Sequence, residues 1–267
     1  MTAITDQNAP LARRSSMLHD LLTVARRAIR GVFREPEFFG PALIVPVFFF
    51  VVNIGALQDF TEGVGIIEDF KAFQLPVSII FAVTGVSRAS ALVTDIQGGY
   101  FDRLLLTPIR RPMLLLGLMF ADLVSIILLA APVTLLGIIL GVRFETGLLG
   151  IVVFLLYAAL WGLGFAGFPY AIALKTGNPA AVNSSFILFF PFAFLTTTFL
   201  PKEALTGWLS TVATYNPVTY VLEGLRSLIT EGWVWSELLK GLGATLALAV
   251  VSFGLASATL RGRVARG

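Results

Sequence analysis

The chain has 267 residues, of which 57% are apolar and 13% charged, and its mean hydropathy is +0.87. A soluble domain carries about 25% charged residues, so this chain lacks the charge to cover a water-facing surface of its size. The 23 Phe exclude a disordered chain. Zero Cys and one His exclude thiolate metal sites, cysteine nucleophiles and histidine triads. The composition is that of a polytopic membrane protein.

The N-terminal part predicts a tail followed by an amphipathic helix. Residues 1–16 are rich in small and polar types and predict a cytoplasmic tail. Over residues 17–35, apolar side chains repeat at helical spacing on one face. The opposite face carries four arginines, Arg26, Arg27, Arg30 and Arg34. We expect this helix to lie in the cytoplasmic interface with its arginines among anionic headgroups; the alternative is a solvated helix with one packed stripe.

Six later stretches approach the ~20 apolar residues that cross a bilayer. They are residues 39–57, 75–93, 113–141, 148–174, 180–200 and 241–260. With the N-terminus inside, 14 of the 19 Lys and Arg residues fall on the cytoplasmic side. The positive-inside rule therefore predicts that both termini are cytoplasmic, and an even number of spans agrees with this.

Two charged residues interrupt these stretches, Arg88 in the second and Asp122 in the third. Counted from the ends of their spans at Asp95 and Pro112, they lie about 10 and 15 Å into the membrane at ~1.5 Å per residue. An unpaired charge at such depth is costly, so we expect an ion pair or a shared polar cluster. The alternative is that Arg88 extends to the headgroups and Asp122 faces water in an inner cavity.

The segment between spans two and three, residues 95–112, predicts a cytoplasmic coupling helix. It carries a short apolar stripe at helical spacing, Tyr100, Phe101, Leu104 and Leu105. Two prolines, Pro108 and Pro112, end the helix and restart the chain into the next span. A simple connection would not need an aromatic stripe flanked by charges, so the pattern favours docking onto a cytoplasmic partner.

Residues 200–239 are too broken and polar to span a membrane. Prolines and glycines alternate there with short apolar runs that hold several Trp and Tyr residues. Because aromatic residues gather at membrane interfaces, one interpretation is an external interfacial loop. Glu223 and Arg226 are three residues apart and could pair on one helical face.

Two segments resemble the signatures of ABC-2-type exporter permeases. The first reads Asp95…Gly99…Arg103-Leu104…Thr107-Pro108-Ile109-Arg110. The second reads Phe189…Pro191…Phe199-Leu200-Pro201…Trp208-Leu209…Asn216-Pro217-Val218-Thr219-Tyr220…Leu225-Arg226. The family also has six spans and an N-terminal interface helix, so the resemblance covers nearly the whole chain. Within the family, the lengths of the chain's segments and the Asn-Pro-…-Tyr segment are most similar to those of bacterial drug-resistance exporter permeases.

The resemblance implies an all-α integral membrane fold in one transmembrane domain, with re-entrant helices before the last span. In this family two permease copies, identical or related, form the pathway, and two separate ABC ATPase subunits bind ATP and Mg. The implied ATPase-coupling residues are Asp95, Gly99, Tyr100, Phe101, Arg103, Leu104, Thr107, Pro108 and Arg110. The implied re-entrant segment includes Pro201, Trp208, Asn216, Pro217, Tyr220, Glu223 and Arg226.

The expected function is that of a permease subunit in the cell (inner) membrane. The sequence has no Gly-x4-Gly-Lys-Ser/Thr motif, so we expect no ATPase, cofactor or metal site in this chain. Spans without polar lining favour an amphipathic or hydrophobic cargo, such as a drug, an antibiotic or a lipid-like molecule. One alternative is a permease for lipids or lipid-linked glycans. A secondary transporter is another, but such proteins usually carry more ionisable groups in their spans than Arg88 and Asp122.

Overall fold

The computed structural model describes residues 26, 29–31, 39–100, 103 and 111–264, and this part of the chain is helical without any strand. The α-helices are α2 (Phe39–Gly63), α3 (Phe70–Thr84), α4 (Ala89–Gln97), α6 (Arg111–Ile139), α7 (Gly147–Thr176), α8 (Pro179–Ser184), α9 (Phe189–Phe194), α10 (Gly207–Tyr215), α11 (Pro217–Thr230) and α12 (Trp235–Val264). Two 3₁₀ helices are η2 (Ser185–Leu188) and η3 (Lys202–Ala204).

Within the described residues, five helical stretches are long and apolar enough to cross a membrane. They are Ala42–Gly63, Phe70–Gln97, Leu116–Ile139, Gly147–Thr176 and Trp235–Gly262. These match the predicted spans one, two, three, four and six. The stretch predicted as span five, residues 180–200, is different, because its apolar helix covers only Pro179–Phe194 and is divided among α8, η2 and α9. A sixth full span therefore stays a prediction.

Several helices extend beyond the predicted spans, and α2 and α12 show why. α2 continues past residue 57 to Gly63, and the Glu62 carboxylate accepts the main-chain N–H of Phe70 at 2.9 Å. α12 begins at Trp235 rather than residue 241, and its first turns hold Glu237 and Lys240 as an ion pair at 2.7 Å. The sequence criterion looked for stretches without charge, so it missed helical turns whose charged residues pair with each other or hold a neighbouring loop.

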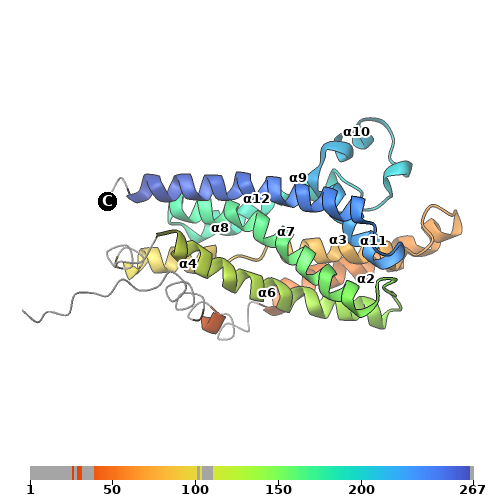
Figure 1. Cartoon of the computed structure of the whole chain (residues 1–267), viewed down its shortest axis with the longest axis horizontal. Helices are drawn as coiled ribbons and strands as arrows, with labels where there is room; N and C mark the ends of the chain where they lie inside the picture. Colours follow the sequence, from red (N-terminus) through yellow and green to blue (C-terminus); the bar gives the residue numbers. More distant parts are fainter. Residues whose placement is uncertain (1–25, 27–28, 32–38, 101–102, 104–110, 265–267) are drawn as a thin grey trace, which may run out of the picture.

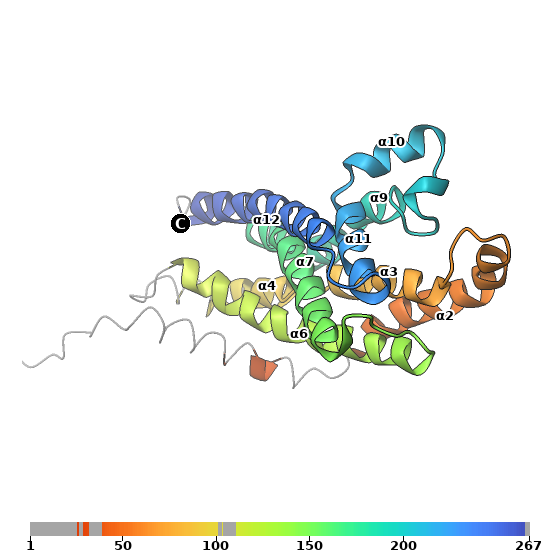
Figure 2. The same cartoon turned by 45° about the vertical axis from the view of Figure 1, so that its right-hand side comes forward.

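The described part of the predicted coupling segment and the short helices before α12 lie at opposite ends of the molecule (Figures 1 and 2). α4, the start of α6 and the C-terminus lie at one end, while α10, α11 and the turn from α2 to α3 lie at the other. α10 and α11 are two short helices directly before α12, as the family resemblance implies for the segment between residues 200 and 239. Their depth in a membrane stays a prediction.

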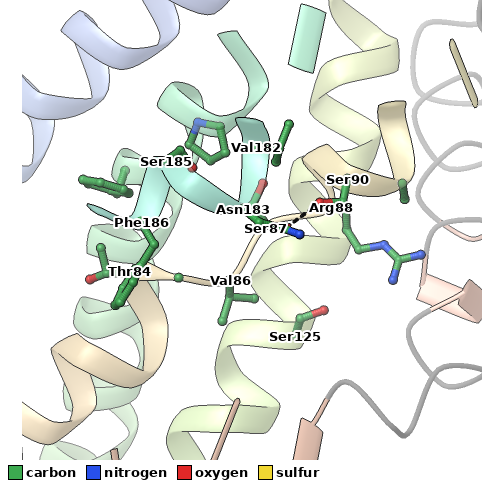
Figure 3. Close-up of a pocket in the computed structure, with 14 residues that line it drawn as sticks. Thr84, Val86, Ser87, Arg88, Ser90, Ser125, Val182, Asn183, Ser185 and Phe186 are labelled. Atoms are coloured by element: carbon green, nitrogen blue, oxygen red, sulfur yellow. Dashed lines mark hydrogen bonds between the residues drawn. The ribbon is translucent and has the colours of Figure 1, made fainter. Parts of the chain in front are cut away.

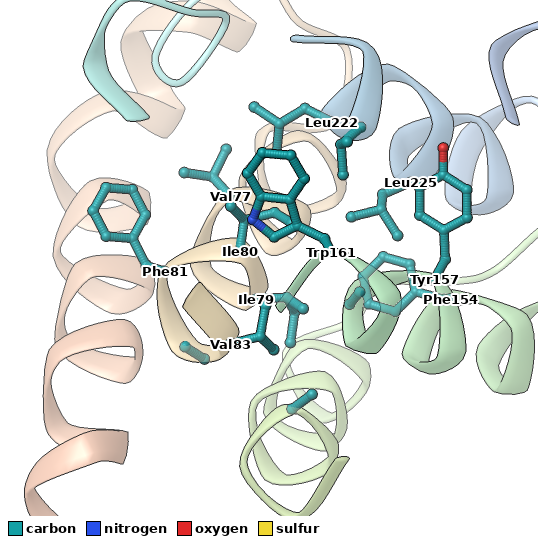
Figure 4. Packing of buried hydrophobic residues seen from close by; sticks show 14 of the residues in the cluster. Val77, Ile79, Ile80, Phe81, Val83, Phe154, Tyr157, Trp161, Leu222 and Leu225 are labelled. Atoms are coloured by element: carbon teal, nitrogen blue, oxygen red, sulfur yellow. The ribbon is translucent and has the colours of Figure 1, made fainter. Parts of the chain in front are cut away.

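The main core lies where α3, α7 and α11 meet (Figure 4). Trp161 of α7 is 1% exposed and lies between Val77 and Ile80 of α3 and Leu222 of α11. Its indole Nε1–H donates to Thr84 Oγ1 at 3.0 Å, which provides the partner that a buried Trp requires. The last residue of α3 is thereby held against α7.

α7 and α12 pack closely through small residues. A Cβ at Gly167 would lie 2.5 Å from Ser252 Oγ, so nothing larger than hydrogen fits there. Ser252 Oγ donates to the main-chain carbonyl of Gly164 at 2.5 Å. Small residues let membrane helices approach closely, and an interhelical hydrogen bond adds to the contact. These contacts hold α12 close against α7 at this level.

Candidate functional site: the break in the second span

The second span is not one continuous helix. α3 ends at Thr84, α4 begins at Ala89, and residues 85–88 between them are not helical. A break leaves the last carbonyls of one helix and the first N–H groups of the next without helical partners. Irregular backbone at membrane depth is tolerated only where protein buries it or where it lines a cavity. Here Val86 is buried, and all four residues of the break line a cavity.

Asp122 of α6 accepts one hydrogen bond from the start of α4 and one from α7. Its Oδ1 accepts the main-chain N–H of Arg88 at 2.6 Å, and its Oδ2 accepts the hydroxyl hydrogen of Tyr170 at 2.6 Å. The carboxyl group is fully buried, at 0% exposure. A helix N-terminus favours a nearby carboxylate because its free N–H groups and dipole are positive. Asp122 therefore caps α4 from a different helix.

The expected pairing of Arg88 and Asp122 takes a different form. The two residues share a polar cluster, but the contact uses the main chain of Arg88. The Arg88 side chain extends away from the cavity (Figure 3). It reaches Gly31, where an added Cβ would lie 2.7 Å from Arg88 Nη2. Because Arg88 is also the N-cap residue of α4, it connects the break to the N-terminal helical residues.

A cavity of about 300 Å³ opens beside the break (Figure 3). One wall is the non-helical segment from Gly85 to Arg88, and α6 contributes Ser125. α7 contributes Phe165, while α8 and η2 contribute the wall from Val182 to Phe186. The Ser90 hydroxyl of α4 donates to Asn183 Oδ1 of α8 at 3.1 Å. The cavity thus combines aromatic and hydroxyl-bearing surfaces within one chain, and sequence reasoning missed it.

The predicted coupling residues lie at the end of α4 and beyond it. Asp95 belongs to α4, and Gly99, at φ +68°, follows the end of this helix. Gln97 Nε2 donates to the carbonyl of Gly177 at 2.9 Å, which ties the end of α4 to the end of α7. Tyr100 and Arg103 are described and exposed. The other predicted coupling residues, Phe101, Leu104, Thr107, Pro108 and Arg110, lie outside the described residues.

The predicted interface helix is described at four residues. Arg26 and Arg30 are helical and exposed, while Ile29 is half-buried and packs against the cluster that includes Leu118 and Tyr170. Exposed arginines with a packed isoleucine between them fit the predicted amphipathic pattern. Arg27 and Arg34 lie outside the described part of the chain.

Asn216 joins three pieces of the segment before the last span. Its Oδ1 accepts the N–H of Val218 at 2.9 Å, which caps α11, and Pro217 occupies the first helical position, where it needs no N–H partner. Asn216 Nδ2 donates to the carbonyls of Phe192 and Leu195, each at 2.7 Å. The Tyr220 hydroxyl donates to the carbonyl of Thr214 at 2.6 Å. These bonds connect the end of α9, the end of α10 and the start of α11. Among the other predicted residues, Pro201 precedes η3 and Trp208 is exposed.

Arg226 has a different partner from the one predicted. It does not pair with Glu223: its Nε donates to the carbonyl of Phe73 at 3.1 Å, and its Nη1 and Nη2 donate to Thr197 Oγ1 at 2.9 Å and to the Thr197 carbonyl at 2.6 Å. The guanidinium also lies 3.5 Å from the centre of the Phe73 ring. Arg226 is only 9% exposed, and the carbonyls of Phe73 in α3 and of Thr197 after α9 satisfy it in place of a carboxylate.

Comparison with known proteins places these features in a family. The model of the ABC-2 type transporter family matches residues 19–230, which include the break, Asp122 and Arg226. The daunorubicin resistance ABC transporter permease protein DrrB1 of Streptomyces coeruleorubidus is 26% identical over 223 residues, covering 81% of this chain and 77% of that protein. The probable doxorubicin resistance ABC transporter permease protein DrrC of Mycobacterium tuberculosis is 22% identical over 211 residues, covering 79% and 76%. A putative transport permease, ycf38, of Cyanophora paradoxa is 23% identical over 227 residues, covering 82% and 78%.

Proposed function

The chain belongs to the ABC-2 type transporter family, and on this premise we propose that it is the permease subunit of an ATP-driven exporter. The observation that carries the proposal is the family match over residues 19–230, together with similarity to permeases named for drug resistance. Five helices that can cross a membrane, among the described residues, support a multi-pass membrane protein. In the proposed orientation both termini face the cytoplasm.

ATP hydrolysis is assigned to separate ABC ATPase subunits, which bind ATP and Mg. Two permease copies, identical or related, form the pathway with two of these ATPases. The path of α4 supports this division, because the helix runs from the break at Arg88 into the predicted coupling segment, which begins at Asp95. A movement of the coupling segment would pass along α4 to its capped end at Asp122.

The cargo we propose is an amphipathic or hydrophobic molecule. Support comes from the apolar spans and from relatives whose names refer to daunorubicin and doxorubicin resistance. Both names refer to drugs, so a drug or antibiotic is favoured over a lipid-linked glycan.

The test is transport by a purified complex. The tagged permease is isolated from its native membrane, the chains that co-purify are identified, and the complex is reconstituted in liposomes. We expect an ABC ATPase to co-purify and daunorubicin to move only when ATP is supplied. Movement driven by a proton gradient without ATP would identify a secondary transporter, and ATP-driven movement of lipid but not of drug would identify a lipid exporter.

A further inference from the structure

We propose that the cavity at the break in the second span is a cargo-binding site contained within one subunit, and that it takes an uncharged aromatic molecule bearing hydrogen-bond-accepting oxygens. The assignment of this ligand as cargo rests on the proposed function. The site itself rests on the geometry of one chain, because all of its walls come from α3, α4, α6, α7, α8, η2 and the segment between α3 and α4.

The size of the cavity fits a small ligand. Its volume of about 300 Å³ lies at the lower end of the ~300–1,000 Å³ typical of ligand pockets. A molecule of two aromatic rings fits inside, and a larger drug that carries a charge elsewhere could place an uncharged aromatic end there. The Phe186 ring reaches the backbone of the break, where a Cβ at Gly85 would lie 3.3 Å from Phe186 Cδ2. Gly85 therefore lets an aromatic wall approach the break.

The lining combines flat apolar surfaces with hydrogen-bond donors. Phe165 and Phe186 supply aromatic faces, which stack on the rings of a ligand. Asn183 Oδ1 is already occupied by the Ser90 hydroxyl, so its amide hydrogens remain for an acceptor. Ser185, 6% exposed overall, lines the cavity from η2, where its hydroxyl can donate to a ligand oxygen.

The charges around the cavity favour an uncharged ligand. Ser90 and Ala91, in the first turn of α4, line the cavity, so a cation would face the positive end of a helix. The Asp122 carboxyl already accepts the main-chain N–H of Arg88 at this helix end, at 2.6 Å, so an anion would compete with it. A carbonyl or ether oxygen accepts hydrogen bonds without either penalty.

Benzophenone provides a direct probe. It is an uncharged ketone with two aromatic rings, and light makes it react with nearby C–H bonds. The purified full-length permease in lipid nanodiscs is irradiated with increasing benzophenone, and the adducts are located by mass spectrometry. We expect saturable labelling of Val182, Phe186 or Ala91, reduced by excess diphenyl ether, which occupies the same space without reacting.

Matched variants separate the cavity from the lipid-facing surface. Ser125→Phe places a ring in the cavity from α6, whereas Leu128→Phe places the same ring on an exposed position of the same helix. Ala91→Phe fills the cavity from the opposite wall in case Ser125→Phe fails to fold. We expect each filling variant to raise the benzophenone concentration that gives half-maximal labelling by about tenfold or more, and the control to leave this concentration unchanged.

Four results would overturn the proposal. They are labelling that does not saturate, adducts that lie elsewhere, equal labelling of the filled variants, and equal labelling by the charged probes 4-benzoylbenzoate and 4-benzoylbenzyl-trimethylammonium. ATP-driven drug transport tests the proposed function separately. Saturable labelling without such transport would contradict the proposed function but not the binding site. Transport that both filling variants leave unchanged would contradict the cargo site but not the proposed function.

Discussion

The main-chain nitrogen of Arg88 lies 2.6 Å from Asp122 Oδ1 and donates its hydrogen to it, so these two residues are joined without using the guanidinium. The same carboxylate accepts the hydroxyl of Tyr170 at 2.6 Å. Three helices, α4, α6 and α7, therefore meet at one buried carboxyl group. The break between α3 and α4 is therefore held in place from the α4 side by this carboxyl group.

The first prediction concerns the partners of Asp122. Asp122→Ala leaves the Arg88 N–H and the Tyr170 hydroxyl buried without an acceptor, which should lower the free energy of unfolding by about 1–3 kcal/mol. Tyr170→Phe removes only one bond and should cost less. In a double-mutant cycle these two substitutions should be strongly coupled, whereas Asp122→Ala and Arg88→Ala, whose side chains interact only through their charges, should be coupled more weakly.

The measurement is reversible unfolding of the wild type, the three single variants and the two double variants in one detergent. Arg88→Ala keeps the main-chain N–H, so it also serves as the control for the loss of charge. A strong coupling between Arg88→Ala and Asp122→Ala would show that the guanidinium, and not the backbone, interacts with the carboxylate.

The second prediction concerns the contact between α7 and α12. Gly167→Ala places a Cβ 2.5 Å from Ser252 Oγ, so the helices must separate, and the free energy of unfolding should fall by about 1–3 kcal/mol. Gly254→Ala in α12 is the matched control, because a Cβ there meets nothing within 4 Å. The control should be neutral or stabilising by up to ~1 kcal/mol, since Ala favours helix over Gly. Equal effects of the two substitutions in thermal unfolding would contradict the close packing.

Hydropathy predicted five of the spans because long apolar stretches must be helical in a bilayer. It missed the break at residues 85–88, since Gly85 and Val86 continue the apolar run and the groups that stabilise the break come from Asp122, far along the chain. The cavity was missed for the same reason. Its polar residues are small, and their gathering depends on how α4, α6 and α8 pack.

The partners of Arg226 were also beyond sequence reasoning. Spacing of three residues suggested Glu223, but the guanidinium is satisfied by carbonyls of Phe73 and Thr197, which no pattern of side chains reveals. The role of Asn216 was predictable in part. An Asn before a Pro signals a helix start, whereas its two bonds to the end of α9 follow only from the fold.

The third prediction uses two Asn-Pro pairs of the same chain. Asn178 and Asn216 both cap a helix through Oδ1, accepting from Ala180 and Val218 at 2.9 Å. Asn→Asp keeps the acceptor at both positions, but at Asn216 it removes the two donated bonds to α9. We expect Asn216→Asp to lower the free energy of unfolding by about 1–3 kcal/mol and Asn178→Asp to have little effect. Similar unfolding curves for both variants would exclude a joining role of Asn216.

The fourth prediction concerns coupling and rests on the proposed function. Phe101→Ala with Leu104→Ala removes the apolar anchors of the predicted coupling helix, and the best buried anchors of an interface each contribute about 2 kcal/mol or more. The double variant should insert normally in the membrane but lose the co-purifying ATPase and drug-stimulated ATP hydrolysis. The control is Trp208→Ala in α10, at the opposite end of the molecule. A double variant that keeps the complex and full transport would show that the partner docks elsewhere.

The fifth prediction is a pH dependence at Glu223 of α11. Burial is the main cause that raises the pKa of this half-buried carboxyl above its usual 4.5; Glu237 and Glu203 raise it further, while Lys202 and Arg226 oppose the shift. The folded protein therefore binds this proton more tightly than the unfolded chain. Its contribution to stability is complete below pH 4.5 and is lost as the pH rises through the raised pKa.

Glu223→Gln stays uncharged and avoids that loss. We expect the variant to gain stability over the wild type as the pH rises from 4 to 8, with the difference reaching a constant value above the folded pKa of Glu223. Thermal unfolding of both proteins across this range measures the difference. Glu231→Gln, at an exposed glutamate just after α11, controls for the removal of one negative charge from the same end of the molecule. If the advantage of Glu223→Gln shrinks with rising pH, the folded pKa of Glu223 lies below its unfolded value, and hydrogen bonds or cations dominate over burial at this site.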